Sequence, residues 1–294
     1  MNAPTPGNLG NPAVLPGSAR SIGDILIASG RLTPADAERI LQRQQKDKSK
    51  FGDAALALGV LTKEDIDFAL SRQFDYAYLP EKDTSRSPEL VAAYKPFSRV
   101  GENLRAVRSQ LMLRWFNSAS THKVIALVSP GSGEGRSFIA ANLAIVFAQQ
   151  GTKTLLIDGD LRRARQHTLF ALGKSAGLSG ILADRAGLEA ALPVQGLNNL
   201  FVLPAGAVPP NPQELLGRVA FGALLHVAAE EFEVIIVDTP AGTDYADAEI
   251  IASRAGAAIM VTRKNVTEVS EATLLARRLQ DSGVVLVGSI LNDD

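Results

Sequence analysis

The stretch over residues 123–138, KVIALVSPGSGEGRSF, constrains the fold more than any other part of the chain. Its apolar residues 124–128 predict a buried strand, and an apolar helical pattern begins at Phe138. The glycines between them allow a tight turn whose backbone N–H groups point inward, where they can bind an anion. A strand, a glycine-rich turn and a helix in this order predict an α/β fold with a phosphate-binding loop.

The loop departs from the usual phosphate-loop spacing at two positions. Pro130 stands where the first glycine is usual, and Arg136 stands where a lysine is usual. Arginine keeps the positive charge, and its planar fork can hold two phosphate oxygens. The alternative is a glycine-rich turn that binds nothing. The residues expected to bind phosphate are Gly131, Ser132, Gly133, Glu134, Gly135, Arg136, Ser137 and Phe138.

Three aspartates follow later strands, in LLIDGDLRR and VIIVDTPAG. Carboxyl ends of parallel strands meet at one sheet edge, so Asp158, Asp160 and Asp238 should lie beside the loop. Because Mg²⁺ takes oxygen ligands, we expect Ser137, Asp158 and Asp238 to hold it. Asp158, Asp160 and Arg136 are the expected catalytic residues, with Asp158 helping to deprotonate an incoming hydroxyl. The alternative is that each aspartate only caps a turn.

Composition excludes several classes of function. The net charge of −1 argues against a broad nucleic-acid surface, and zero cysteines exclude disulfides and thiolate metal sites. No apolar run approaches the roughly 18 residues of a membrane span, and the N-terminus lacks a signal-sequence pattern. We therefore expect a cytoplasmic protein without direct membrane insertion, peripheral to the inner membrane only through a partner.

The N-terminal part contains an internal repeat. IGDILIASGRLTPADAERILQRQ begins at Ile22, and FGDAALALGVLTKEDIDFALSRQ begins at Phe51. Each copy predicts a short helix, a glycine stop, a threonine-capped turn and a second amphipathic helix. The expected organisation is a disordered tail, a helical tandem-repeat domain, a linker and a phosphate-loop domain, over residues 1–18, 19–79, 80–98 and 99–294 respectively.

This repeat resembles the N-terminal domain of type II secretion and pilus ATPases. In some of those proteins two tandem motifs bind cyclic di-GMP, so the resemblance implies a site for that nucleotide. Ser21 and Lys50 stand where the motif has arginines, which would remove stacking and bidentate contacts. The alternative is a protein-docking domain that binds no nucleotide.

The region after the loop alternates apolar strands with helical patterns, which predicts a mostly parallel sheet covered by helices on both faces. The expected strands are residues 154–157, 200–203, 234–237, 257–261 and 284–290, and the expected helices include 246–253 and 266–281.

Four segments together resemble the bacterial tyrosine kinases of polysaccharide export, which are relatives of the partitioning ATPases. They are the phosphate loop, LLIDGDLRR, VIIVDTP and LPAGAVPPNPQELL. The resemblance covers residues 99–294. It implies a protein that binds ATP and Mg²⁺ and regulates exopolysaccharide polymerisation, chain length or export. It also implies a partner, a membrane chain-length determinant protein (polysaccharide co-polymerase).

Glu102, Arg105 and Arg108 match the family's Glu-x-x-Arg-x-x-Arg motif, which mediates ring assembly in the resembled proteins. The resemblance therefore implies a homo-oligomer with these residues at its interface. The alternative is a solvated charged helix face with weak pairs within the helix.

Two departures leave alternative functions open. The family typically ends in a tyrosine-rich tail, whereas this sequence ends in GSILNDD, and Arg136 replaces the loop lysine. We therefore expect weak or no autophosphorylation, with Tyr76 or Tyr78 modified first. The alternatives are a nucleotide-binding regulator that transfers no phosphate and responds to cyclic di-GMP, or a partitioning-type ATPase. The missing extra lysine at the start of the loop argues against the latter.

Overall fold

The computed structural model describes residues 21–73, 78–79, 83–117 and 121–293. The tail expected over residues 1–18 and Tyr76 lie outside these residues. The chain divides into two compact units, residues 1–76 and 77–294. Within the described residues, no helix is both long and apolar enough to cross a bilayer.

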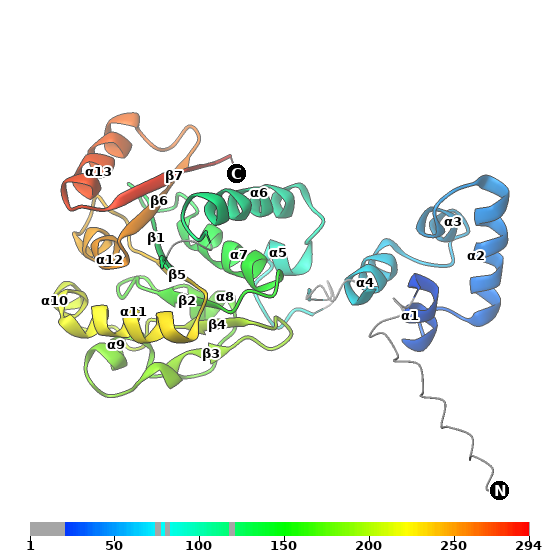
Figure 1. The fold of residues 1–294 in the computed structure, drawn as a ribbon, viewed down its shortest axis with the longest axis horizontal. Helices are drawn as coiled ribbons and strands as arrows, with labels where there is room; N and C mark the ends of the chain where they lie inside the picture. The colour runs from blue at the N-terminus through cyan, green and yellow to red at the C-terminus, as the bar shows by residue number, and fades with distance from the viewer. Residues whose placement is uncertain (1–20, 74–77, 80–82, 118–120, 294) are drawn as a thin grey trace, which may run out of the picture. The chain divides into compact units, whose positions relative to one another are not determined.

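The first unit is helical, and each copy of the repeat forms two helices (Figure 1). Hydroxyl caps begin the longer helix of each copy: Thr33 accepts from the N–H of Asp36, and Thr62 accepts from that of Asp65. Gly30 lies at φ 71° and its repeat partner at φ 63°, so a glycine stops the first helix in both copies. The bounds are α1 Ile22–Ala28, α2 Pro34–Asp47, α3 Phe51–Ala57 and α4 Lys63–Gln73.

The second unit contains a seven-stranded sheet in the order β3-β4-β2-β5-β1-β6-β7. Every strand pair is parallel except β3 with β4, so the predicted α/β fold with a mostly parallel sheet is confirmed. The bounds are β1 Val124–Val128, β2 Thr154–Asp158, β3 Leu192–Pro193, β4 Leu200–Leu203, β5 Val234–Asp238, β6 Ala257–Arg263 and β7 Val285–Asn292.

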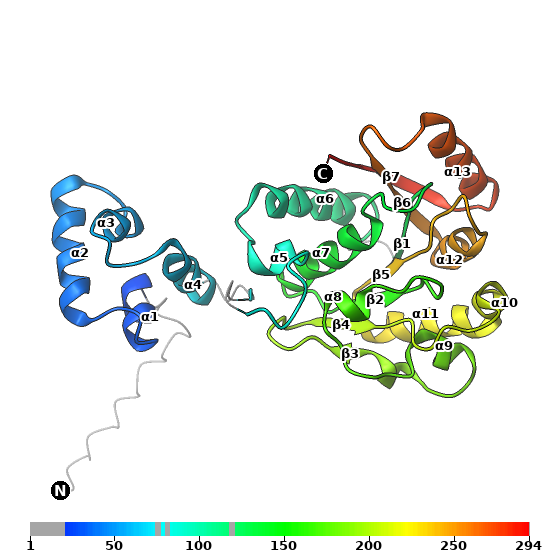
Figure 2. The same cartoon turned by 180° about the vertical axis from the view of Figure 1, so that it is seen from behind.

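Alternate residues of each central strand feed two separate cores. Ile125 and Leu127 of β1 pack into one core, and Ala126 and Val128 pack into the other. Figures 1 and 2 show helices on both faces of the sheet. The first face carries α5 Val91–Tyr94, α6 Arg99–Arg114, α7 Arg136–Ala148 and α8 Gln166–Leu169. The second carries α9 Gly177–Leu182, the 3₁₀ helix Leu188–Ala190, α10 Pro212–Gly217, α11 Val219–Glu231, α12 Asp247–Ala255 and α13 Val269–Asp281.

The linker expected over residues 80–98 is corrected by the structure. Its described part contains α5, whose alanines are fully buried against α7. The N–H of Ala92 donates to Oδ1 of Asn142 at 2.8 Å, and Gln149 donates to the Ala92 carbonyl at 2.9 Å. Buried amides need such partners, so α7 requires this segment. The compact second unit therefore begins at Ala77 rather than at residue 99.

Candidate functional site

The three predicted aspartates meet at one edge of the sheet. Asp158 ends β2 and Asp238 ends β5, and the two residues are directly paired across the parallel strands. Both side chains are fully buried, while Asp160, two residues beyond β2, is 6% exposed. The loop that follows β1, the neighbour of β5, lies at the same edge. The carboxylates and the phosphate loop are thus brought together as the sequence predicts.

Glycine is required inside the loop for two different reasons. Gly133 and Gly135 have φ values of 77° and 90°, a backbone region that L side chains avoid. A Cβ on Gly135 would also lie 2.3 Å from Nδ2 of Asn292. Gly135 precedes the first residue of α7, so the positive end of that helix dipole faces the loop.

Side chains from β6 and β7 hold the loop in place. Arg263 donates to the carbonyl of Gly133 at 3.1 Å, and Asn292 donates to the carbonyl of Glu134 at 3.2 Å. The carboxylate of Glu134 in turn accepts from the N–H of Gly131 at 2.9 Å. These contacts hold two of the loop carbonyls, and a loop fixed in this way is preorganised to bind an anion through its backbone N–H groups.

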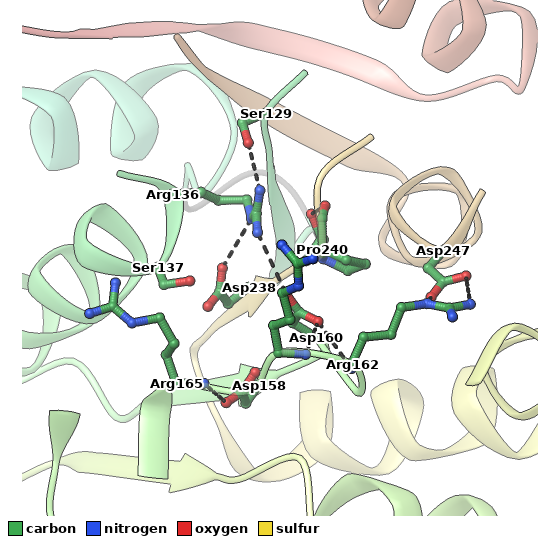
Figure 3. A network of polar contacts seen from close by, with 12 residues as sticks. Ser129, Arg136, Ser137, Asp158, Asp160, Arg162, Arg165, Asp238, Pro240 and Asp247 are labelled. Carbon is green, nitrogen blue, oxygen red and sulfur yellow. Dashed lines mark hydrogen bonds and ion pairs between the residues drawn. The ribbon is translucent and has the colours of Figure 1, made fainter. Parts of the chain in front are cut away.

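Arg136 turns toward the carboxylates, as Figure 3 shows. Its Nη1 donates to Oγ of Ser129 at 2.6 Å. Its Nε lies 3.4 Å from Oδ1 of Asp238, and its Nη2 lies 3.7 Å from Oδ2 of Asp160. The side chain is 9% exposed. Arg136 therefore serves as the counter-ion of the buried carboxylates.

Burial dominates the electrostatics of the two strand-end aspartates. It raises the pKa of Asp158 well above the ordinary carboxyl value, and the nearby Asp238 raises it further. Burial also raises the pKa of Asp238, although Arg136 and the hydrogen bonds from Gln166 and Ser137 oppose that shift. Two buried carboxyls side by side favour a bound cation, because a cation stabilises their charged forms.

The residues present fit a magnesium ion. Oδ1 of Asp158 and Oδ1 of Asp238 are buried, and neither has a hydrogen-bond partner among the described residues. Carboxylate and hydroxyl oxygens are ligands that Mg²⁺ prefers, and Ser137 supplies a hydroxyl beside Asp238. In the described part of the chain, no group of three or more His, Cys, Asp or Glu residues could hold a metal. The ion would therefore depend on phosphate oxygens as well.

A cavity of about 440 Å³ opens above the loop. Asp160 lines it, whereas Asp158 and Asp238 lie buried behind it. Two predicted phosphate-binding residues, Gly131 and Phe138, do not line it. The N–H of Gly131 donates to the carboxylate of Glu134, and Phe138 lines a different cavity. The cavity is lined by Ser132, Gly133, Glu134, Gly135, Arg136, Ser137, Asp160, Arg162, Arg163, Arg165, Val208, Pro209, Pro210, Pro212, Pro240, Ala241, Asp244 and Tyr245.

The sequence interpretation missed Arg162, Arg163 and Arg165, which add positive charge to the cavity wall. Arg162 and Arg163 are the last two residues of LLIDGDLRR. Their position shortly after Asp160 could have indicated that they lie near the site. Oδ1 of Asp160 accepts from the backbone N–H groups of Arg162 and Arg163, at 3.1 and 2.8 Å. Asp160 therefore shapes the turn that presents these arginines.

The sequence interpretation also missed Gln166, which contacts Asp158, Asp238 and the phosphate-loop residue Ser137. Its backbone N–H donates to Oδ2 of Asp158 at 2.9 Å. Its side-chain amide donates to Oδ2 of Asp238 at 2.8 Å and to the carbonyl of Ser137 at 3.1 Å. Gln166 thus fixes the orientation of both buried carboxylates.

The predicted oligomer residues lie on α6. Nη2 of Arg105 lies 2.6 Å from Glu102, whose side chain is 67% exposed. Arg108 instead donates to the carbonyl of Val146 on α7 at 2.8 Å. Glu102 and Arg105 therefore pair on α6 itself, whereas Arg108 connects α6 to α7.

Comparison with known proteins identifies the family. The CobQ/CobB/MinD/ParA nucleotide binding domain matches residues 125–286, which include the loop and both aspartate motifs. The tyrosine-protein kinase YwqD of Bacillus subtilis is 36% identical over 204 residues, covering 69% of this chain and 85% of YwqD. The chain belongs to the bacterial tyrosine-protein kinase family.

Solved structures of this and neighbouring families share the fold. The kinase domain of the Escherichia coli tyrosine kinase ETK superposes with a TM-score of 0.67 and 32% identity, over 71% of this chain and 81% of that domain. The septum site-determining protein MinD of Pyrococcus horikoshii, complexed with Mg-ADP, gives a TM-score of 0.51 and 26% identity, over 58% and 70% of the respective chains. The expected phosphate-loop fold of the kinase family is thus confirmed.

Proposed function

We propose that this protein is an ATP- and magnesium-dependent tyrosine kinase that acts at the cavity above the phosphate loop. The observation that carries the proposal is the meeting of that loop, a buried arginine and two buried carboxylate oxygens that accept no hydrogen bond from the described residues, all at one sheet edge. This arrangement offers cationic and N–H groups to phosphates and oxygen ligands to a metal. The family relation supports tyrosine as the acceptor.

Each residue has a distinct part in this proposal. Ser137, Asp158 and Asp238 would hold the metal, which when bound neutralises charge on the phosphates. The loop N–H groups and Arg136 would bind the phosphate oxygens. Asp160, the carboxylate that lines the cavity, would orient the acceptor hydroxyl and take its proton.

We also propose a setting for this activity, on the strength of the family resemblance. The protein would regulate exopolysaccharide polymerisation or export at the cytoplasmic face of the inner membrane, through a membrane chain-length determinant protein. The helical unit would serve as a docking module. Ser21, which stands where the cyclic di-GMP motif has an arginine, caps α1 through a capping box with Asp24 and offers no guanidinium to a nucleotide.

Assembly through α6 is a further part of the proposal. An exposed ion pair within one helix contributes little to stability, so pairs at a subunit interface are a better reason for the charge pattern. Light scattering with ATP-Mg should show an oligomer for the wild type and a smaller species for Glu102→Ala/Arg105→Ala. Arg108 is left intact because it contacts α7. A wild type that is monomeric under all nucleotide conditions contradicts this part.

Labelled ATP tests the kinase activity against its alternatives. We expect label on protein tyrosine from the wild type and none from Asp160→Asn. This variant should retain nucleotide binding, because an amide oxygen can still accept from the backbone N–H groups of Arg162 and Arg163. Release of free phosphate without labelled protein would identify an ATPase instead. ATP binding with neither product would identify a nucleotide-binding regulator.

A further inference from the structure

Tyr245 lies in the wall of the cavity that the proposed kinase would use. It belongs to the loop between β5 and α12, seven residues after the buried Asp238. Its side chain is 44% exposed, and it shares the cavity with Ser137 of the phosphate loop and with Asp160. A tyrosine is therefore already present where an acceptor would have to enter.

Neighbouring charges hold the Tyr245 ring in place. The guanidinium of Arg162 lies 3.7 Å from the ring centroid, a cation–π distance. Arg162 is itself held by Asp247, with Nε–Oδ2 and Nη2–Oδ1 distances of 2.7 and 3.3 Å. The hydrogen bond from Arg162 to Asp247 raises the pKa of Arg162, and the charges of the Asp247 and Asp160 carboxylates add to that shift. Arg162 thus interacts both with the Tyr245 ring and, through charge, with the Asp160 carboxylate.

The other described tyrosines are placed less well for modification. Tyr94, the last residue of α5, is 8% exposed and packs in the core. Tyr78 is half-buried and does not line the cavity. Within the described residues, Tyr245 therefore combines the greatest tyrosine exposure with a place beside the phosphate loop.

We propose that Tyr245 is a phosphoryl acceptor for the cavity of its own chain, an inference that rests on the proposed kinase activity. The phenolic oxygen forms a bond to the γ-phosphorus of ATP while the bond from that phosphorus to the β–γ bridging oxygen breaks. ADP leaves with the bridging oxygen, and the phenolic proton passes to Asp160. The products are ADP and phosphotyrosine at position 245.

The charge around Tyr245 would retain the product. A phosphotyrosine carries about −1.5 to −2 charges near neutral pH, and arginine binds such groups with paired hydrogen bonds. Arg162, Arg163 and Arg165 line the same cavity. The modified side chain would compete with the phosphates of the next ATP for these arginines, so phosphorylation at Tyr245 should weaken nucleotide binding.

The test uses the full chain, incubated with ATP-Mg and mapped by peptide mass spectrometry. We expect phosphate on Tyr245 in the wild type and in the control Tyr78→Phe, and none at this position in Tyr245→Phe. The rate per chain should not change when the protein is diluted, since donor and acceptor share one cavity. Calorimetry supplies a second readout: phosphorylated wild type should bind ATP more weakly than the unmodified wild type.

The outcomes separate this inference from the proposed function. ATP binding without phosphate at Tyr245, or phosphate only at other tyrosines, overturns the inference and leaves the nucleotide site intact. A rate per chain that falls on dilution overturns transfer within one chain. Absence of any ATP binding overturns the proposed function itself and the inference with it.

Discussion

Nε of Arg136 lies 3.4 Å from Oδ1 of Asp238, and neither atom has a hydrogen-bond partner among the described residues. Both side chains are buried, so the pair interacts through charge in a poorly solvated site without a well-made hydrogen bond. The same guanidinium is the group expected to grip phosphate. Phosphate binding by Arg136 would therefore change its contact with the carboxylate of Asp238.

Removing the charge of Arg136 should destabilise the nucleotide-free protein and weaken its ATP affinity. Arg136→Met leaves the buried carboxylate of Asp238 without its cation, a change that costs about 3–5 kcal/mol in comparable buried pairs. Arg136→Lys keeps a charge and should lose less stability. Urea denaturation and calorimetry measure the two effects.

The matched control for Arg136 is Arg39→Met, which removes an exposed partner of Asp36 in the first unit. Exposed pairs contribute little to stability, so this variant should differ little from the wild type. Equal losses of stability in Arg39→Met and Arg136→Met would contradict the counter-ion role.

Asn292 lies too close to the Cβ position of Gly135 to leave room for a side chain, so Gly135→Ala should lose nucleotide affinity. The added methyl meets Nδ2 of Asn292 and adopts a left-handed backbone, which costs about 1–2 kcal/mol for the backbone alone. Gly151→Ala is the matched control, because Gly151 has φ 92° with open space around its Cβ position.

Both glycine variants should lose stability, as thermal unfolding will measure, but only Gly135→Ala should lose ATP affinity. Adding Asn292→Ala should restore part of that affinity by removing the clash. Equal ATP affinities in the two single variants would show that Asn292 does not shape the loop.

The ion pair on α6 predicts a pH dependence of a definite sign. The hydrogen bond from Arg105 lowers the pKa of Glu102 below its ordinary value. The stabilisation is therefore present above the ordinary glutamate pKa of about 4.3 and is lost as pH falls through the lowered folded-state pKa. Glu102→Gln should melt below the wild type at neutral pH, and the two melting temperatures should converge in acid. A gap that widens in acid would refute this assignment.

The sheet was readily predicted because its strands are apolar runs that end at turns. Residues 200–203 match β4 fully, and the strand predicted over 257–261 extends to Arg263 in β6. The sequence interpretation missed β3, which has two residues and includes Pro193 at an antiparallel edge. So short a strand has no periodicity to read, because its pairing with β4 defines it.

The site could be predicted as a set of residues but not as a set of contacts. Strand-end placement brought Asp158 and Asp238 together, since parallel strands share one carboxyl edge. The orientation of Arg136 depends on the nearby Ser129 and on two carboxylates from distant parts of the chain, Asp160 and Asp238. The residues of α5 were likewise interpreted as a linker. The side chain that holds Ala92 of this helix belongs to Asn142, which lies 50 residues away in the sequence. Contacts of this kind follow from the fold rather than from local pattern.

Calorimetric titration of ATP, with Mg²⁺ and with EDTA in its place, tests the central claim most directly. The wild type should bind ATP much more tightly with Mg²⁺, whereas Asp238→Asn should lose most of that difference because a metal ligand is gone. Glu230→Gln, a change on the exposed part of α11, should behave as the wild type does. An Asp238→Asn protein whose ATP affinity still depends on Mg²⁺ as strongly as the wild type's would contradict the account.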